Sequence, residues 1–357
     1  MKYWFGYLTA GIFGAITWVL MQFGERFSVL VDMIYPYVIR TLESTLAEWS
    51  AGAVYPLWQT LAVVLGVLVL ASLVLVIVLK WNPIQWAGWV LAVFAGIYML
   101  HTTLWGLNYY AGSLADDMRL EVGSYNLEEL TEATEYYRDM ANIMALMVNR
   151  DSSGKLDFAD FETLAEEAGE GFQCLTYDYS YPIFAGSTLP VKKLGWSDMY
   201  TSMGITGVTF GLTGEACVNP QIPDVSLPFT MAHEMAHRMC IAPERDANFA
   251  AFLACSVHSD PEFQYSAYFM AYRYCYSALS SADPEAAARV WQGVSAEVAA
   301  DCRASAEQAA ALRSETASRV SNQVYDTYLK SFSVDSGVQS YGEVTDLLLG
   351  WYFQRLR

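Results

Sequence analysis

The segment FTMAHEMAHRMC, Phe229 to Cys240, holds the most informative pattern in the chain: two histidines four residues apart, with a glutamate after the first. On a helix, this spacing places the rings of His233 and His237 on one face, where each can give one nitrogen to the same tetrahedral Zn2+ ion. Glu234 then projects beside the metal and can accept a proton from a water molecule whose pKa zinc lowers to about 7. The pattern predicts a zinc site suited to metal-assisted hydrolysis.

The segment that follows, APERDANFAAF, contains two candidate carboxylates for a third metal ligand. Pro243 is suited to open a new helix, and Glu244 and Asn248 share one face of that helix. We expect Glu244 to be the third ligand and Asn248 to hydrogen-bond the remaining nitrogen of a ligand histidine. Asp246 is the competing carboxylate, although it can instead be a favourable charge at the helix N-terminus. This Glu-x-x-x-Asn spacing after the histidines resembles the glutamate zincins.

The segment ITGVTFGLTGEACVN precedes the predicted zinc helix and contains a candidate substrate strand. An edge strand can bind an extended peptide by main-chain pairing, and the stretch from Thr209 to Glu215, with Gly211 and Thr213, is placed for this role. Glu215 can equally be a solvated turn residue. Tyr265 is the tyrosine that we favour for stabilising an oxyanion, although packing is the usual role in a chain with 24 tyrosines. The other residues considered for this role are Tyr268, His258 and Tyr341.

Three uncharged apolar runs occupy the first third of the chain, at about residues 4–24, 57–79 and 84–107. Each can form a membrane-spanning helix of about 20 residues. The first run is expected to be retained as an anchor, because no small-x-small cleavage site follows it. Between the first two runs, VDMIYPYVIRTLESTLAEW has apolar residues at helical spacing and is interpreted as an amphipathic, interfacial helix.

The charge is divided unevenly along the chain. Residues 1–110 hold four basic and four acidic residues, so the whole net charge of -18 falls on residues 111–357. Such an acidic domain is repelled by nucleic-acid phosphates, so we expect no nucleic-acid partner. The predicted partners are the lipid bilayer and a peptide or protein substrate at the membrane surface. Lys2 and Lys80 favour a cytoplasmic location for the ends that carry them, which predicts a multi-pass protein of the cell membrane with an extracytoplasmic catalytic domain.

The sequence patterns in the second part of the chain predict mostly helices. The predicted strand is Ile205–Phe210, and the predicted helices are Asn126–Arg150, Phe158–Gly169, Phe229–Cys240, Glu244–Ser256, Pro261–Ser280, Pro284–Gln323 in one or two pieces, and Tyr341–Phe353. The six cysteines all lie in this part without metal-ligand spacing, and both disulfides and free thiols are compatible with them. We therefore expect a mainly α membrane protein. A membrane domain at 1–110 precedes an α+β, zincin-like domain of the glutamate type at 111–357, with a small β-sheet.

Several segments together resemble an uncharacterised family of bacterial membrane proteins, domain of unknown function 3810, regarded as zinc metallopeptidases. The segments that carry the resemblance are WGLNYY at Trp105–Tyr110, GITGVTFGLTGEACVN at Gly204–Asn219, LPFTMAHEMAHRMCIAPERDANFAAFLAC at Leu227–Cys255, YSAY at Tyr265–Tyr268, and GVQSYGEVTDLL near the C-terminus. The resemblance implies three N-terminal spans followed by a zincin-like domain with His233, His237 and Glu244 as ligands. It does not supply a substrate.

The sequence thus predicts a membrane-anchored zinc metallopeptidase in which Glu234 is the general base. Two alternatives remain at this point. One is a membrane sensor or regulatory protein that keeps a zincin-like domain for binding or for one regulated cleavage. The other is a zinc hydrolase of cell-wall amide bonds, which the same metal chemistry would serve.

Overall fold

A computed structural model describes residues 4–334 and 343–357. The chain forms two compact units, which we describe separately. The membrane unit consists of residues 1–112 together with Phe210–Glu215, and the C-terminal unit consists of residues 113–209 and 216–357. The assignment of the six residues Phe210–Glu215 to the membrane unit is not visible in the sequence, because they lie about one hundred residues beyond the last apolar run.

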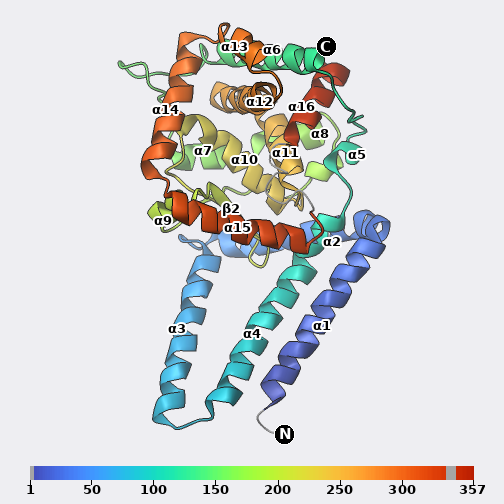
Figure 1. Cartoon of the computed structure of the whole chain (residues 1–357), viewed down its shortest axis with the longest axis vertical. Coiled ribbons are helices and arrows are strands. Elements are labelled where there is room, and N and C mark those ends of the chain that lie inside the picture. Colours follow the sequence, from blue (N-terminus) through green and yellow to red (C-terminus); the bar gives the residue numbers. More distant parts are fainter. Residues whose placement is uncertain (1–3, 335–342) are drawn as a thin grey trace. The chain divides into compact units, whose positions relative to one another are not determined.

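Three helices of the membrane unit are long and apolar enough to cross a membrane: α1 (Phe5–Arg26), α3 (Leu57–Val78) and α4 (Pro83–Leu104) (Figure 1). Their positions agree with the three predicted apolar runs, and each could span a membrane by its length and composition. Helix α4 begins where the side chain of Asn82 accepts hydrogen bonds from two main-chain amides of the first turn. Helices α1 and α4 pack closely, since a Cβ atom added to Gly6 would lie 2.4 Å from the carbonyl carbon of Gly88. Small residues permit this approach.

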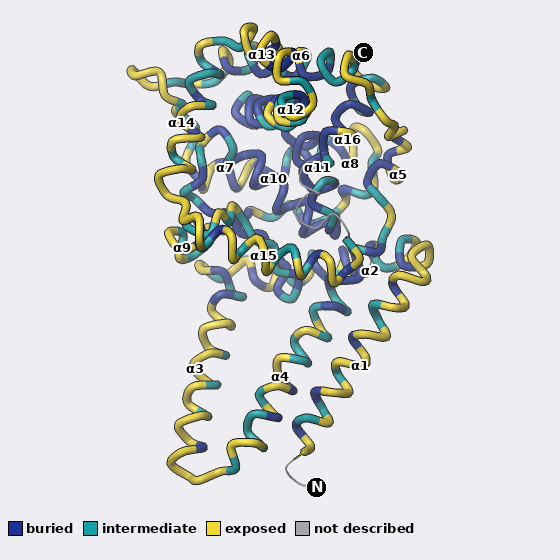
Figure 2. Tube along the Cα trace, viewed as in Figure 1, coloured by how far each residue is buried: buried dark blue, intermediate teal, exposed yellow. Residues whose placement is uncertain are grey.

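Helix α2 (Ser28–Ala51) lies between α1 and α3 in the sequence and has two unlike faces. Its buried side includes the charged residues Arg40 and Glu43. Its exposed apolar side chains recur at helical spacing: Val29, Leu30, Met33, Ile34, Tyr37 and Val38. The predicted amphipathic helix is therefore confirmed. Helix α3 is exposed along almost its whole length and is nearly all aliphatic, as expected for a helix that faces lipid (Figure 2). A short 3-10 helix, Gly106–Tyr110, follows α4.

The C-terminal unit is a packed set of helices around one hydrophobic core. Its helices are α5 (Leu114–Asp117), α6 (Leu127–Met144), α7 (Phe161–Glu167), α8 (Glu170–Tyr177), α9 (Ser197–Met203), α10 (Leu227–Arg238), α11 (Glu244–Ser256), α12 (Pro261–Ala282), α13 (Pro284–Trp291), α14 (Ala296–Leu312), α15 (Glu315–Ser331) and α16 (Val344–Trp351). Helix α6 begins with a capping box between Asn126 and Glu129, as the acidic first turn predicts. Figure 2 shows α10 and α11 as the most deeply buried helices of this unit.

The predicted helical stretch Pro284–Gln323 is wrong in its number of pieces. It begins in α13, continues as α14 and ends inside α15, so three helices cover it. Each of them starts at a side chain that accepts main-chain hydrogen bonds: Asp283 for α13, Ser295 for α14 and Ser314 for α15. These caps divide the stretch into separate helices, although its alanine-rich composition suggests a continuous helix. Of the predicted C-terminal helix, Tyr341 lies outside the described residues, and α16 begins at Val344.

A three-stranded sheet belongs to the C-terminal unit except for Phe210 and Glu215, two strand ends that are assigned to the membrane unit. Its strands are β1 (Lys192–Lys193), β2 (Gly207–Phe210) and β3 (Glu215–Val218), in the order β1-β3-β2. β1 pairs parallel to β3, with Lys192 opposite Cys217. The predicted strand is confirmed as β2, which lies at one edge. The predicted substrate strand Thr209–Glu215 is corrected: β2 stops at Phe210, and a turn of four residues leads into β3. Gly214 in that turn has φ +64°, which favours glycine.

Candidate metal centre

Helices α10 and α11 carry the residues of the predicted metal site. All twelve residues of α10 are buried, so its alanine and methionine side chains pack on every side. The helix closes at Cys240, whose φ of 71° reverses the chain. After three further residues, Glu244 opens α11 directly behind Pro243. This short connection returns the start of α11 to the end of α10.

The described structure brings together the side chains of His233, His237 and Glu244, all three buried. The Nε2 atom of His233 lies 3.2 Å from Oε2 of Glu244, and Nε2 of His237 lies 3.7 Å from the same oxygen. Ligand atoms about 2.0–2.1 Å from a tetrahedral zinc ion stand roughly 3.3 Å apart. The three side chains therefore fit a zinc ion by both donor type and spacing.

The protonation pattern also suits a cation. The Nδ1 atom of His237 lies 2.8 Å from the carbonyl oxygen of Ile241, which can only accept, so Nδ1 carries a proton and Nε2 offers a lone pair in the neutral ring. Burial would lower the pKa of His237, but the charge of Glu244 outweighs this and raises the pKa to about 9. Burial likewise opposes ionisation of Glu244, yet the two histidines hold its pKa well below the usual value. The electrostatic environment of His237 and Glu244 therefore favours a positive charge at this site.

Two polar atoms of this candidate metal group, which consists of His233, His237 and Glu244, lack a hydrogen bond within the described residues. In the described part of the chain, Oε2 of Glu244 and Nδ1 of His233 are buried without a hydrogen bond. Buried polar atoms in native proteins are rarely left so, and an unplaced ion or water is a common explanation. For Oε2 of Glu244, which faces both histidines, a metal ion is the partner that its surroundings fit.

The carboxyl group of Glu234 lies against strand β2. The hydroxyl of Thr209 is 2.8 Å from Oε2 of Glu234 and 2.8 Å from its main-chain oxygen. A Cβ atom at Gly207 would come within 2.4 Å of Oε1 of Glu234, so only glycine leaves room for this carboxyl group. Burial raises the pKa of Glu234, while the nearby His233 and His237 oppose that rise. The carboxyl is thereby poised to take up a proton.

The chain matches a sequence family over most of its length. Residues 31–349 fit the family described as protein of unknown function (DUF3810). The chain belongs to this family. No curated protein and no solved structure matches it. The family match covers the metal group, the sheet and most of the helices, and it carries no assigned activity.

A tyrosine that the sequence does not single out contacts the candidate metal group of this DUF3810 protein. The hydroxyl of Tyr325, on α15, donates to Oε1 of Glu244, the oxygen that faces away from the histidines. It lies 81 residues further along the chain and is one of 24 tyrosines, so no sequence pattern marks it. A donor of this kind fixes the orientation of a metal-binding carboxylate.

The predicted role of Asn248 is corrected. Its side-chain oxygen accepts from the hydroxyl of Tyr274 at 3.1 Å, and its buried amide nitrogen has no hydrogen-bond partner in the described residues. The hydrogen bond that orients the ring of His237 is made instead with the main-chain carbonyl of Ile241. Asp246, the alternative third ligand, accepts from the amide of Leu114 at 3.1 Å. Glu244, and not Asp246, joins the histidines.

The remaining residues of the predicted substrate strand have other partners. Glu215 is only 2% exposed, so it is not a solvated turn residue. Its carboxylate accepts from the main-chain amides of Leu57 and Trp58 in the membrane unit. Thr213 donates to the same carboxylate. Gly211, in the turn, also belongs to the membrane unit. Of the predicted strand, Thr209 alone contacts the Glu234 carboxyl group.

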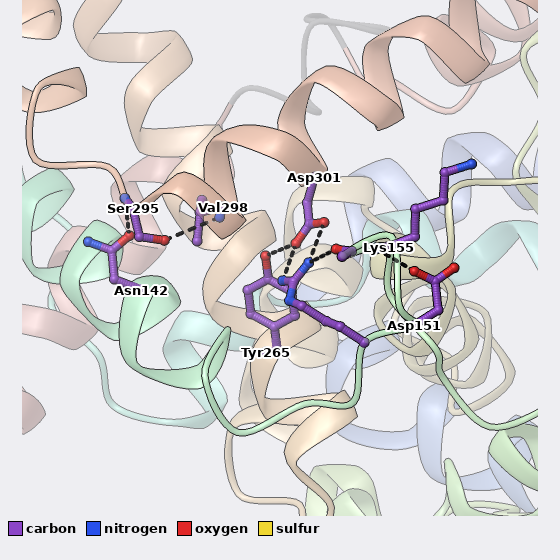
Figure 3. Close-up of polar contacts among 9 residues, drawn as sticks. Asn142, Asp151, Lys155, Tyr265, Ser295, Val298 and Asp301 are labelled. Atoms are coloured by element: carbon purple, nitrogen blue, oxygen red, sulfur yellow. Dashed lines mark hydrogen bonds and ion pairs between the residues drawn. The ribbon is translucent and has the colours of Figure 1, made fainter.

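Tyr265 belongs to a separate buried network (Figure 3). Its side chain is 0% exposed, and its hydroxyl donates to Oδ2 of Asp301 at 2.5 Å. Arg150 binds both oxygens of the same carboxylate, at 3.0 Å and 2.7 Å. These contacts give the hydroxyl of Tyr265 a role in joining α12, α14 and the segment before α7. They do not support the predicted role in stabilising an oxyanion.

Proposed function

We propose that the protein is a membrane-anchored, zinc-dependent peptidase. The observation that carries the proposal is the convergence of two imidazole nitrogens on one oxygen of Glu244 that lacks a hydrogen bond within the described residues. A second carboxyl group, Glu234, lies on the helix that carries both histidines. Two histidines, one glutamate and an adjacent basic carboxylate are the donor set of a hydrolytic zinc site.

His233, His237 and Glu244 would hold the metal. When bound, zinc supplies Lewis-acid chemistry: it lowers the pKa of a water molecule and polarises a carbonyl group. Glu234 would accept a proton from the attacking water and deliver it to the leaving amine, since a general base acts in reverse as a general acid. Thr209 holds Oε2 of Glu234, so Oε1, the atom that Gly207 leaves room for, is the one placed to carry the proton.

An extended peptide is the substrate class that the surroundings favour. β2 is an edge strand, and its residues are half-buried, so its outer main-chain groups can pair with an added strand. Such pairing would run beside the Glu234 carboxyl that Thr209 contacts. The three spans hold the enzyme at a membrane, and the positions of Lys2 and Lys80 favour an extracytoplasmic location for the catalytic unit.

The proposal is tested on the full chain in detergent micelles. Metal analysis is expected to find one zinc per chain, and labelled casein is expected to be cleaved in a manner that a chelator abolishes. Glu234→Gln should keep its zinc and lose about 10²–10⁴-fold in turnover. Glu128→Gln, at the exposed start of α6, is the matched control and should behave as the wild type. A chain without zinc and without turnover contradicts the proposal.

Two further outcomes point to the other functions. Zinc without turnover of any peptide favours the regulatory protein. Digestion of purified cell wall, but not casein, by wild type and not by Glu234→Gln favours the amide hydrolase.

A further inference from the structure

The turn between β2 and β3 carries a buried carboxylate with an unusual partner. Glu215 accepts from the amide of Leu57 at 2.7 Å through Oε1 and from the amide of Trp58 at 2.9 Å through Oε2. These amides open α3, and Pro56, the residue before them, has no side chain that could accept from them. Glu215 therefore caps a membrane-spanning helix from 158 residues away. A carboxylate at a helix N-terminus is stabilised by both hydrogen bonds and the helix dipole.

Three other residues of the β2–β3 segment also pack closely against Trp58, Trp105 and the main chain of α2. The ring of Phe210 stacks on that of Trp58, with centroids 5.4 Å apart. A Cβ atom at Gly211 would lie 2.9 Å from the side chain of Trp105. One at Gly214 would lie 2.5 Å from the main chain of α2. These contacts leave the turn little freedom to move independently of α2 and α3.

The residue directly before this turn is Thr209, whose hydroxyl holds the carboxyl of Glu234. Phe210 and Thr209 are consecutive residues of the short strand β2. A displacement of about 1 Å in a catalytic group can cost 10²-fold in rate, so the position of the turn matters for Glu234.

We infer that Glu215 is a positioning residue: by capping α3 it fixes the β2–β3 turn, and through Thr209 it sets the position of the Glu234 carboxyl. This inference rests on the proposed function for its catalytic consequence. It also gives a role to the turn residues Thr213, Gly214 and Glu215, which the proposed metal chemistry does not use.

The test is a double-mutant cycle in the full chain, with labelled casein as the substrate. Glu215→Gln puts an amide N–H where one helix amide needs an acceptor, and Thr209→Val removes the hydroxyl but keeps the shape. Each is expected to lower kcat about tenfold, with KM and zinc content unchanged. Because both act on Glu234 through one path, the double variant should be no slower than the worse single variant. Multiplied effects, or a change confined to KM or zinc content, overturn the inference.

Two additions keep the test decisive. Thr213→Val removes one hydrogen bond from Glu215 and is a milder variant, expected to lower kcat in the same direction. Asp283→Asn, which alters a capping carboxylate on α13, is the matched control and should leave kcat unchanged.

Hydrogen exchange separates this inference from the proposed function, since it needs no turnover. Glu215→Gln is expected to speed exchange of the β2 amides by roughly tenfold or more, whereas Asp283→Asn should not. Unchanged exchange overturns the inference whether or not the wild type is a peptidase. Absence of casein cleavage by the wild type, with faster exchange in Glu215→Gln, counts against the proposed function and leaves the positioning of the turn by Glu215 supported.

Discussion

Removal of the Tyr325 hydroxyl should weaken zinc binding without removing a ligand. Glu244 has two oxygens with different tasks: Oε2 faces both histidines, and Oε1 accepts from Tyr325. Glu244 is 3% exposed, so water cannot readily replace the lost donor in Tyr325→Phe. In the metal-free variant only the contacts with the two histidines orient the carboxylate, so zinc binding must supply the orientation that Tyr325 gives in the wild type.

The magnitude follows from the kind of hydrogen bond that is lost. A hydrogen bond to a charged group contributes about 1.5–3 kcal/mol. If that stabilisation is realised mainly in the metal-bound state, it corresponds to roughly a 10–100-fold loss of affinity, the range usual for residues that orient metal ligands. The assay is competition for zinc against a chromophoric chelator, with the full chain in detergent.

Tyr352→Phe is the matched control for this experiment. It also removes a hydroxyl that donates to a glutamate, Glu132, at 3.0 Å, but Glu132 is not among the metal-binding group. Its zinc affinity should equal that of the wild type. Equal affinities for Tyr325→Phe and the wild type, with both variants folded, would refute the role of the hydroxyl.

Three further predictions concern packing and catalysis. Gly207→Ala should lower kcat by about 10²-fold with zinc retained, because the new methyl group displaces the Glu234 carboxyl; wild-type turnover would contradict this contact. Tyr265→Phe should cost about 1–3 kcal/mol of unfolding free energy by leaving Asp301 short of a donor, with kcat unchanged; a large fall in kcat at unchanged stability would restore its catalytic role. Gly6→Leu should destabilise the protein by about 1–3 kcal/mol in thermal unfolding, because its side chain meets the main chain of α4; an unchanged melting temperature would show that α1 and α4 do not pack this tightly.

The sequence was most informative about features that depend on residues close together in the chain. The three candidate spans follow from continuous apolar runs, because a bilayer requires about 20 apolar residues of a helix that crosses it. His233 and His237 share a face because 3.6 residues complete one helical turn. Glu244 joins them because the connection between α10 and α11 is short, so the geometry of the ligand set is nearly local.

Local sequence patterns could not predict contacts between segments that are far apart in the chain. Tyr325 reaches Glu244 across 81 residues, and Glu215 reaches the start of α3 across 158. Asn248 and Tyr265 show the converse: local patterns suggested roles near the metal, whereas packing gave them Tyr274 and Asp301 as partners.

The sequence by itself thus determined the three long apolar helices and the candidate metal ligands, because both depend on the composition or spacing of a single helix or of two adjoining ones. The tertiary structure alone decided what holds the candidate ligands and the base in place. A side chain's hydrogen-bond partner depends on which helices pack together, and one chain of 24 tyrosines and 38 acidic residues offers too many pairs for spacing to select among them.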